Sequence, residues 1–368
     1  MSVHIWLRAE SKPHEERSAL TPATAAELLR AGFAVSVERS AQSAIPAEDF
    51  AAVGCRLVPA GSWPQAPDDA FILGLKELPD DGSELHHRHI HFAHAFKEQR
   101  GWQDVLRRFA RGGGQLYDLE FLLDDNGRRV AAFGYWAGFT GAAVAVKTWC
   151  GQRLGRDPVV PPLHTYASRD ALLAELREEL VDATNAATSD AGRRPTAMVI
   201  GALGRVGSGA CGLADALGLA VTRWDMAETA VGGPFAEILA HELFINCVMV
   251  NAPLPPFITD ELLDGGGEPR RLSVISDVSC DPFGDYNPLP VYKACTTFPE
   301  PTLRLREASL AGPALDLIAI DHLPSMLPAE SSEDFSTQLL PHLLQLGAPD
   351  NPVWRGALGV FHDKSRGL

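Results

Sequence analysis

A glycine-rich turn between residues 199 and 209 places the strongest constraint on how this chain folds. Its sequence, Val-Ile-Gly-Ala-Leu-Gly-Arg-Val-Gly-Ser-Gly, overlaps the end of a short apolar run, Pro195–Ile200. The spacing is G-x-x-G-x-x-G rather than G-x-G-x-x-G, but the physical demand is the same. The backbone must turn sharply at the start of a helix, where free N–H groups and the helix dipole attract phosphate. The residues predicted to bind the pyrophosphate of a dinucleotide are Gly201, Gly204, Arg205, Val206 and Gly207.

The strand predicted after this turn, Ala220–Asp225, ends at an aspartate. A carboxylate at that place accepts hydrogen bonds from the adenosine ribose hydroxyls and repels a 2′-phosphate. We therefore expect Asp225 to select NAD over NADP. A glycine-rich turn beside a surface aspartate is the simpler alternative.

Strands and helices are predicted to alternate along the chain. The expected strands are His4–Leu7, Phe33–Glu38, Phe71–Leu75, His89–Phe96, Pro195–Ile200, Ala220–Asp225, Leu243–Val250 and Leu272–Val278. The expected helices are Ala23–Arg30, Gln99–Ala110, Asp170–Thr188 and Phe335–Leu346. Before the first helix, Thr21 and Pro22 have the residue types preferred at the N-cap and the first helical position. This order predicts parallel sheets covered by helices, and 368 residues exceed one ordinary core, so we expect a two-domain α/β protein.

The overall charge and the cysteine pattern limit the partners. Asp and Glu number 47 against 32 Lys and Arg, a net charge of −15, which argues against a nucleic-acid partner. No apolar run is long enough to span a membrane, and the first residues read as a strand rather than a leader peptide. The six cysteines form no CxxC pair. We expect a cytoplasmic protein with reduced thiols, monomeric or a small homo-oligomer, that acts on small molecules.

Charged side chains gather at the ends of predicted strands in the first third of the chain. Lys76 and Glu77 follow one strand, His94 lies near the end of another, and Glu120 comes after an apolar run. Because ligands bind beyond the carboxyl ends of parallel strands, these groups are expected to converge on one cleft. Lysine and histidine there could transfer protons, with the two glutamates adjusting them. A solvated surface charge is the alternative at each position.

Two further features of this region concern carboxylates and metals. Arg17 and Arg129 could hold carboxylates by fork geometry. Five histidines lie between residues 86 and 94, but no cysteine is near them, so no metal is expected. His91 and His94 are interpreted as strand residues, one buried and one facing a cleft.

These residues stand in a pattern that resembles the NAD-dependent, lysine-forming saccharopine dehydrogenases, and more distantly the alanine dehydrogenases and proton-translocating transhydrogenases. The resemblance extends from near residue 5 to near residue 330. The segments that carry it are Arg8–Pro22, Pro59–Trp63, Gly74–Glu77, His91–His94, Leu116–Glu120, Gly127–Gly134, Gly201–Arg205, Gly232–Phe235, Asp277–Ser279 and Ile320–Ser325.

The resemblance implies two Rossmann-like domains with parallel sheets and an active-site cleft between them. It implies a substrate domain of residues 1–138 plus 326–368 and an NAD-binding domain of residues 139–325. It also implies a reaction of lysine metabolism and amino-acid biosynthesis. Saccharopine is oxidised by NAD and hydrolysed to lysine and 2-oxoglutarate, or formed from them in reverse.

Roles carry over from the family to matching positions. Lys76 is expected to handle protons during imine hydrolysis and His94 to deprotonate the secondary amine, with Glu77 and Glu120 tuning both. The expected holders of substrate carboxylates are Arg17, Arg129, Lys12 and Lys97. The expected cofactor contacts beyond the glycine-rich turn are Asp225, Asp277, Asp321 and His322.

The sequence also departs from the fungal members, and other functions stay open. Val206 stands where those members have cysteine, so a disulfide from there to Cys247 is not possible, and the loop 280–288 differs in detail. An opine-type enzyme joining another amine to a 2-oxo acid would use the same residues. An alanine dehydrogenase would have a smaller pocket, and a non-catalytic NAD-binding protein would lack Lys76 or His94.

Overall fold

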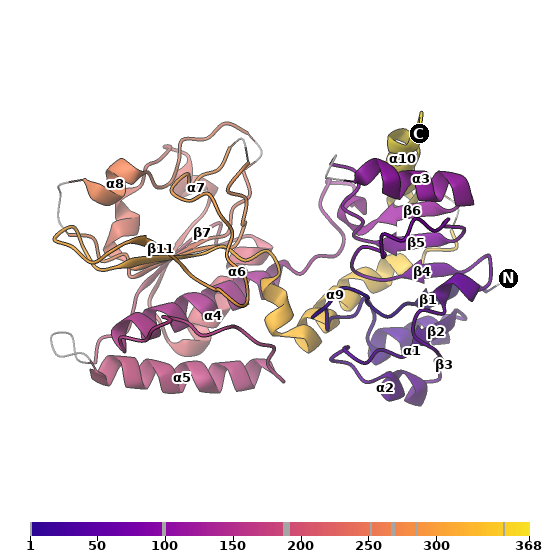
Figure 1. Ribbon diagram of the computed structural model, residues 1–368, viewed down its shortest axis with the longest axis horizontal. Helices are drawn as coiled ribbons and strands as arrows, with labels where there is room; N and C mark the ends of the chain where they lie inside the picture. Colours follow the sequence, from indigo (N-terminus) through magenta and orange to yellow (C-terminus); the bar gives the residue numbers. More distant parts are fainter. Residues whose placement is uncertain are drawn as a thin grey trace. The chain divides into compact units, whose positions relative to one another are not determined.

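The computed structural model describes residues 2–97, 101–186, 192–250, 252–265, 269–284, 286–348 and 350–368. The chain divides into two compact units (Figure 1). Unit 1 contains Met1–Phe133 and Pro328–Leu368, and unit 2 contains Gly134–Leu327. Each unit is a six-stranded sheet with helices, which confirms the predicted α/β class.

The sheet of unit 1 is parallel throughout, in the order β3-β2-β1-β4-β5-β6. Its strands are β1 His4–Leu7, β2 Ala34–Glu38, β3 Arg56–Val58, β4 Phe71–Leu73, β5 Arg88–His91 and β6 Gln115–Asp118. The strand order reverses at β1, which has β2 on one side and β4 on the other. In such sheets, ligands bind beyond the carboxyl ends of the strands near the reversal.

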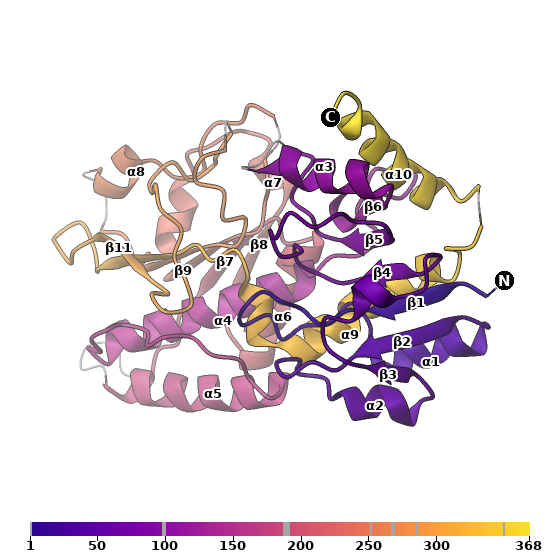
Figure 2. The same ribbon diagram turned by 45° about the vertical axis from the view of Figure 1, so that its right-hand side comes forward.

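Helices from both ends of the chain cover the sheet of unit 1. They are α1 Pro22–Arg30, α2 Ala47–Ala52, α3 Trp102–Gly112, α9 Pro328–Leu343 and α10 Pro352–Ser365, with short 3-10 turns η1 Trp63–Gln65 and η2 Leu119–Phe121. Thr21 caps α1 and Pro22 is its first residue, as predicted. The returning C-terminal segment packs α9 on α1 and α10 along β6 and α3 (Figure 2). Phe335 and Leu339 of α9 join the same core as Ile5 and Leu73.

The sheet of unit 2 has the order β11-β12-β10-β9-β7-β8, and only its edge strand β11 is antiparallel to its neighbour. Its strands are β7 Ala197–Ile200, β8 Val221–Trp224, β9 Leu243–Asn246, β10 Val274–Asp277, β11 Leu303–Arg306 and β12 Leu315–Ile318. The order again reverses beside the first strand of the unit, because β7 lies between β8 and β9.

One long helix lies at the centre of unit 2. The helices there are α4 Gly134–Arg153, α5 Arg169–Ala186, α6 Arg205–Leu217, α7 Met226–Thr229 and α8 Asp260–Asp264, with 3-10 turns η3 Ala236–Ala240 and η4 Leu323–Met326. Helix α4 packs closely on α6 because a side chain at Gly138 would collide with the backbone of Val206 and Ala210. This close contact with α4 holds the start of α6 in place.

Several predicted boundaries were wrong. The strand expected to reach Phe96 ends at His91, and the strand expected to reach Val250 ends at Asn246. Five helices, α2, α4, α7, α8 and α10, were not predicted. The connection expected from Gln152 begins inside the last turn of α4. Gln99, the predicted start of one helix, and Thr188, the predicted end of another, lie outside the described residues. The two compact units divide at 133/134 and 327/328, where α4 begins at Gly134 and α9 at Pro328. The domain boundaries 138/139 and 325/326 implied by the resemblance stay a prediction.

Candidate active site

The segments that follow β4 and β5 carry the two proton-handling candidates side by side. The amide of Gly74 donates to the carbonyl of Ile90 at 3.0 Å, and that of Phe92 donates to the carbonyl of Leu75 at 2.9 Å. These bonds continue the parallel pairing beyond the strands and bring the chain at Lys76 beside the chain leading to His94. His94 has a φ of +51°, an unusual value for a residue with a side chain. Such strained backbone positions concentrate at functional sites.

Glu77 lies between His94 and Lys12. Its carboxylate lies 3.6 Å from Nε2 of His94 and 3.8 Å from Nζ of Lys12. All three side chains are 40% or more exposed, so substrate can reach them. The structure thus brings together three of the predicted site residues through one carboxylate.

Glu120 makes a similar link from the end of β6. It lies in η2, and its carboxylate accepts a hydrogen bond from Nζ of Lys97 at 2.7 Å. Arg129 approaches the same oxygen at 3.9 Å. Both cations predicted here to hold substrate carboxylates are therefore paired with a protein carboxylate.

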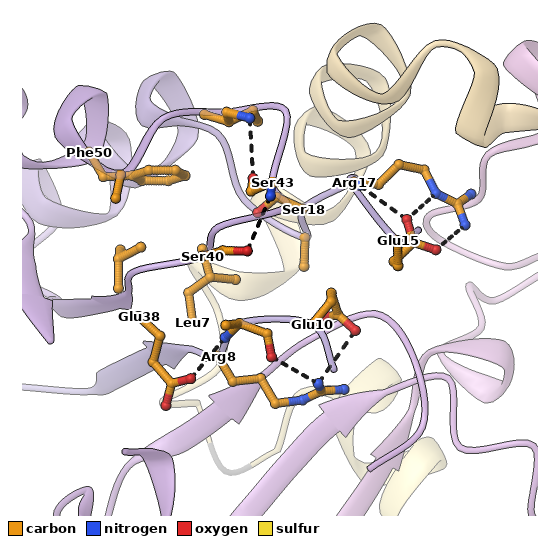
Figure 3. A pocket seen from close by; sticks show the side chains of 15 residues that line it. Leu7, Arg8, Glu10, Glu15, Arg17, Ser18, Glu38, Ser40, Ser43 and Phe50 are labelled. Atoms are coloured by element: carbon orange, nitrogen blue, oxygen red, sulfur yellow. Dashed lines mark hydrogen bonds and ion pairs between the residues drawn. The ribbon is translucent and has the colours of Figure 1, made fainter. Parts of the chain in front are cut away.

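Arg17, also predicted to hold a substrate carboxylate, is paired with Glu15 of its own loop. Its Nε and one Nη donate to the two oxygens of Glu15 at 2.7 and 2.6 Å, and the guanidinium lies 4.4 Å from the centre of the Phe133 ring (Figure 3). One edge of the guanidinium fork is thus taken up by Glu15, and the side chain is only 4% exposed. Burial by itself would raise the pKa of Glu15, but the hydrogen bonds and charge of Arg17, with the charge of Lys76, lower it.

Arg8 and Glu10 fix the backbone of Lys76, and sequence reasoning missed both. The two oxygens of Glu10 accept hydrogen bonds from the amides of Leu75 and Lys76 at 2.6 and 3.0 Å. Arg8 donates to the carbonyl of Lys76 and lies 3.4 Å from Glu10 (Figure 3). A side chain at Gly74 would collide with the Arg8 guanidinium, so glycine is required there. Their place in Arg8–Pro22, one of the segments that carry the family resemblance, was the available signal.

A cavity beside these residues is large enough only for water. It has a volume of about 30 Å³ and is lined by side chains that include Arg8, Glu10, Arg17 and Glu38 (Figure 3). That volume suits one or two water molecules. Glu38 is itself satisfied internally, since it accepts from the indole of Trp6 and from the amides of Ala9, Gly61 and Trp63.

Asp118, at the end of β6, ties the His94 and Glu120 segments together. One of its oxygens accepts from the amide of Ala93 at 3.3 Å and the other from the amide of Glu120 at 2.9 Å. The residue is fully buried. Burial raises the pKa of Asp118 to about 7, against the lowering effect of these two hydrogen bonds.

The neighbouring histidines form an aromatic row. His87, His89 and His91 are buried, and adjacent rings pack edge to face. Burial lowers the pKa of His89 and of His91 well below the usual value, so both are neutral near pH 7. Of His91 and His94, one of which was expected to be buried, His91 is the buried one, and His94 lies beyond the end of β5 rather than in a strand. Within the described ranges, no group of three or more His, Cys, Asp or Glu side chains is arranged to hold a metal ion.

In unit 2, the glycine-rich turn has the predicted geometry between β7 and α6. Gly201 adopts a φ of +85°, and a side chain at Gly207 would collide with the backbone of Gly201 and Ala202. Gly204 is the N-cap of α6, and no side chain caps that helix. A side chain at Gly204 would fill the space in front of the free amides at the start of α6. Its Cβ would lie 3.3 Å from the carbonyl oxygen of Gly201. This open, side-chain-free helix start fits a pyrophosphate.

Asp225 lies directly after β8 and contacts the turn. Its Oδ2 accepts from the amide of Leu203 at 2.8 Å, and its Oδ1 accepts from the amide of Met226 at 2.9 Å at the start of α7. The carboxylate is partly exposed, which leaves lone pairs for ribose hydroxyls. The residues present therefore fit an NAD molecule.

The remaining cofactor candidates differ in accessibility. Asp277 is buried and accepts from Asn246, Tyr292 and Ser279, with the shortest bonds at 2.6 Å. Its carboxylate thus holds Ser279 and Tyr292, in the segment that follows β10. Asp321 is exposed, and His322 stacks on Phe298 with ring centres 4.4 Å apart. Asn246 and Tyr292 were not predicted, because their partner lies far along the sequence.

Comparisons with known proteins identify the family of this chain. The family described as alanine dehydrogenase/PNT, N-terminal domain, matches residues 6–140. Saccharopine dehydrogenase (NAD+, L-lysine-forming) of Yarrowia lipolytica is 50% identical over 98% of this chain and 96% of its own. The enzyme of the same name from Schizosaccharomyces pombe is 48% identical over 97% of each chain.

Solved structures of lower identity share the fold. An L-alanine dehydrogenase has a TM-score of 0.64 at 16% identity, covering 97% of this chain and 94% of that one. A transhydrogenase from Sinorhizobium meliloti has a TM-score of 0.63, also at 16% identity, covering 96% and 97%. The fold, the residues at the strand ends and nearly full-length identity near one half lead to one conclusion: the chain belongs to the family of NAD+-dependent, L-lysine-forming saccharopine dehydrogenases.

Proposed function

We propose that this protein catalyses the reversible, NAD+-dependent cleavage of saccharopine. Saccharopine, NAD+ and water give L-lysine, 2-oxoglutarate, NADH and a proton. The observation that carries this proposal is identity of 45–50% to six saccharopine dehydrogenases over nearly the whole chain. The adjacent Lys76 and His94 segments support it, since the chemistry needs two proton-handling groups.

Unit 2 would hold the cofactor. The amides at the start of α6 would bind the pyrophosphate, and Asp225 would accept hydrogen bonds from the ribose hydroxyls. Asp321 and His322 are the candidates for the nicotinamide side. When bound, NAD+ supplies the acceptor for hydride.

His94 would deprotonate the secondary amine, because only the neutral amine has the lone pair that supports loss of hydride. Its imidazole faces Glu77 at 3.6 Å, so the proton it accepts gains a nearby opposite charge. The φ of +51° at His94 is a strained backbone conformation of the kind that concentrates at functional sites, which supports this role.

Lys76 would serve the hydrolysis that follows. Water must add to the carbon–nitrogen double bond of the substrate, and the resulting carbinolamine must lose its amine. The attacking water must lose a proton from oxygen, and the departing amine must take up a proton on nitrogen, so a second acid–base group is needed beside His94. The bonds from Arg8 and Glu10 hold the Lys76 backbone in place for this role.

The cations of unit 1 would bind the carboxylates of saccharopine. Lys12, Lys97 and Arg129 are each at least 38% exposed and each lies beside a glutamate. Arg17 would use the guanidinium edge that does not bind Glu15. Substrate binding would therefore exchange protein carboxylates for substrate carboxylates.

We further propose that the protein acts in the cytoplasm as a monomer or small homo-oligomer. All six cysteines are free thiols, which suits a reducing compartment. None of the helices in the described parts of the chain is long and apolar enough to cross a lipid bilayer.

A substrate panel tests the proposal. NADH loss is followed spectrophotometrically with 2-oxoglutarate and, in turn, lysine, ornithine, arginine, alanine or ammonia. We expect rapid oxidation with lysine alone, and mass spectrometry should identify saccharopine as the product. Turnover with a different amine would assign the product of that amine, rather than saccharopine, as the substrate of the reverse reaction. NADH binding without turnover of any amine would overturn the proposed activity.

A further inference from the structure

Two cysteine thiols of unit 2 lie in contact with each other. The sulfur atoms of Cys280 and Cys295 are 3.4 Å apart, and neither cysteine belongs to a disulfide. Cys280 is half-buried and Cys295 is exposed, whereas Cys55, Cys150 and Cys211 are buried. Cys280 and Cys295, which we call the thiol pair, therefore combine a sulfur–sulfur contact with access from solvent.

Cys280 follows a segment that is anchored at the carboxyl end of β10. The amide of Val278 donates to the carbonyl of Asn246 at 3.0 Å, and the hydroxyl of Ser279 donates to Asp277 at 2.6 Å. Cys280 itself has a φ of +50°. Such a backbone conformation is strained for a residue with a side chain, and strained residues concentrate at functional sites. The chain leading to Cys280 is thus fixed by the sheet, and the cysteine follows it in a strained conformation.

Cys295 precedes a residue that is anchored beside the end of β12. The amide of Thr296 donates to the carbonyl of Ala319 at 2.7 Å, and its hydroxyl accepts from the amide of Ala319 at 2.9 Å. Ala319 directly follows β12, which pairs in parallel with β10. Both thiols therefore lie at the carboxyl edge of the sheet, the edge at which Gly201 and Asp225 follow β7 and β8.

The two sulfur atoms are close enough for a bond to form after small side-chain rotations. An S–S bond is about 2.0 Å long, so the sulfur atoms of Cys280 and Cys295 must approach by about 1.4 Å. Rotations about the two Cα–Cβ bonds move the sulfur atoms without moving the backbone. The anchoring hydrogen bonds on either side can therefore persist when the bond forms.

The environments of the two thiols differ. Burial, the contact with Cys295 and the charges of Asp277 and Asp321 raise the pKa of Cys280 well above its usual value. Cys280 is therefore protonated near neutral pH. Thiol–disulfide exchange begins at a thiol that the reagent can reach, and in this pair that thiol is the exposed Cys295.

We propose that the thiol pair is a site of reversible oxidation by low-molecular-weight disulfides. Cys295 attacks a disulfide such as glutathione disulfide, which forms a mixed disulfide and releases one glutathione thiol. Cys280 then attacks the sulfur of Cys295, which forms the protein disulfide and releases the second glutathione. The proton of each cysteine passes through water to the departing glutathione. Two protein thiols are thus oxidised, and one glutathione disulfide is reduced to two thiols.

This bridge is separate from the disulfide of the fungal members, which Val206 excludes in this chain. Disulfides of reducing compartments are usually transient or redox-sensing, which agrees with two thiols that are reduced but in contact. The proposal does not depend on the activity proposed above, because it concerns only the chemistry of Cys280 and Cys295.

Peptide mapping of the intact protein tests the proposal. Reduced wild type is incubated with glutathione disulfide, the remaining thiols are alkylated, and a tryptic digest is analysed by mass spectrometry. Trypsin cleaves after Lys293, so Cys280 and Cys295 fall in different peptides unless a disulfide joins them. Wild type is compared with Cys280→Ser and Cys295→Ser. Cys247→Ser is the control, because Cys247 is also half-buried but lies outside the thiol pair.

We expect wild type and the control to yield peptides joined through Cys280 and Cys295. This product should be at least about tenfold more abundant than any other cysteine-linked product, because the two thiols are already in contact. Dithiothreitol should reverse it. Cys280→Ser should stop at the mixed disulfide on Cys295, and Cys295→Ser should take up glutathione at Cys280 at least about tenfold more slowly.

The measurement on wild type decides the matter even if a variant does not fold. Three results would overturn the proposal: a mixed disulfide that persists on Cys295, full alkylation of both members of the thiol pair after oxidation, or a dominant bridge from Cys247 to another cysteine.

Discussion

Individual carboxylates in unit 1 each hold a cation that the proposed reaction needs. Glu77 contacts Lys12 and His94, Glu120 contacts Lys97 and Arg129, and Glu15 binds Arg17. Without such partners, a cluster of cations would repel itself. These pairs hold the cations in place beside the ends of the strands.

Replacing Lys76 by methionine tests its role in proton transfer. Methionine retains the length and the apolar part of the side chain but cannot carry a proton. We expect turnover to fall by about 10²-fold or more, with NADH affinity unchanged because the glycine-rich turn is untouched. Steady-state kinetics and NADH fluorescence titration measure the two effects, with Lys364→Met on α10 as control. Unchanged turnover would exclude the proton-transfer role.

Asp225 tests the preference for NAD. In Asp225→Ala, the ribose contact and the hydrogen bond to the Leu203 amide are both lost. We expect weaker NAD binding, by about tenfold, and weaker discrimination against NADP. Asp225→Asn keeps an acceptor for the Leu203 amide without the charge, so it should relax discrimination with a smaller loss of NAD affinity. Equal use of NAD and NADP by wild type would contradict this reading.

Asp118 should make stability depend on pH. Its pKa is about 7 in the folded protein against 3.8 for an ordinary aspartate, so the folded state binds the proton more tightly. Stability linked to this group is therefore full below about pH 4 and declines as pH rises towards about 7. Relative to wild type, Asp118→Asn should gain about 2–3 kcal/mol between pH 5 and pH 8. Denaturant unfolding at both pH values measures this change, and a constant difference would argue against the raised pKa.

At the scale of secondary-structure elements, β5 is unusual because it buries histidines where apolar residues are expected. His89 is 0% exposed, its ring packs against Trp63 and Phe109, and neither ring nitrogen has a hydrogen-bond partner among the described residues. An unsatisfied buried nitrogen reduces the stability of the folded state. The strand therefore carries a local penalty in the sheet that supports His94.

His89→Phe should remove that penalty. Phenylalanine preserves the edge-to-face packing, so we expect a gain of about 1–2 kcal/mol in unfolding free energy at pH 8. The gain should increase at pH 5, because the folded state keeps His89 neutral while the unfolded state binds a proton below about pH 6.5. Chemical denaturation is the measurement, with the exposed His362→Phe on α10 as control. A loss of stability at both pH values would show that His89 makes a polar contact.

At the scale of the whole molecule, the two predicted sets of site residues fall in different units. All candidates for substrate binding and proton transfer belong to unit 1, and all candidates for cofactor binding belong to unit 2. The C-terminal segment returns to complete unit 1, where Phe335 stacks on Phe133 with ring centres 4.5 Å apart. The proposed reaction therefore needs ligands on both units.

Hydrogen exchange with each ligand tests this assignment. NADH should slow exchange at residues 201–207 and 225–226, because the amides at the start of α6 and α7 would lie beside the bound cofactor. Saccharopine should slow exchange near residues 76–77 and 129. NADH protection at the strand ends of unit 1, without protection of the glycine-rich turn, would reverse the assignment.

The sequence by itself determined the features that depend on neighbours a few residues apart. The strand-turn-helix around Gly201 and the cap of α1 at Thr21 are of this kind, because dihedral preferences and capping bonds are local. The same holds for Lys76 and Asp225, which follow their strands directly. Helix α4 escaped prediction because residues 138–151 are buried on every side, so no apolar stripe marks the helical period.

Only the tertiary structure decided which charges pair and which polar groups are buried. Nothing in the spacing shows that Glu10 binds the amides of Leu75 and Lys76, or that Tyr292 donates to Asp277. Arg17 was singled out from the sequence, yet its pairing with Glu15 depends on how the chain around it folds beside Phe133. Such contacts depend on strand order and burial, which join residues far apart in the chain, and burial also determines the pKa of Asp118.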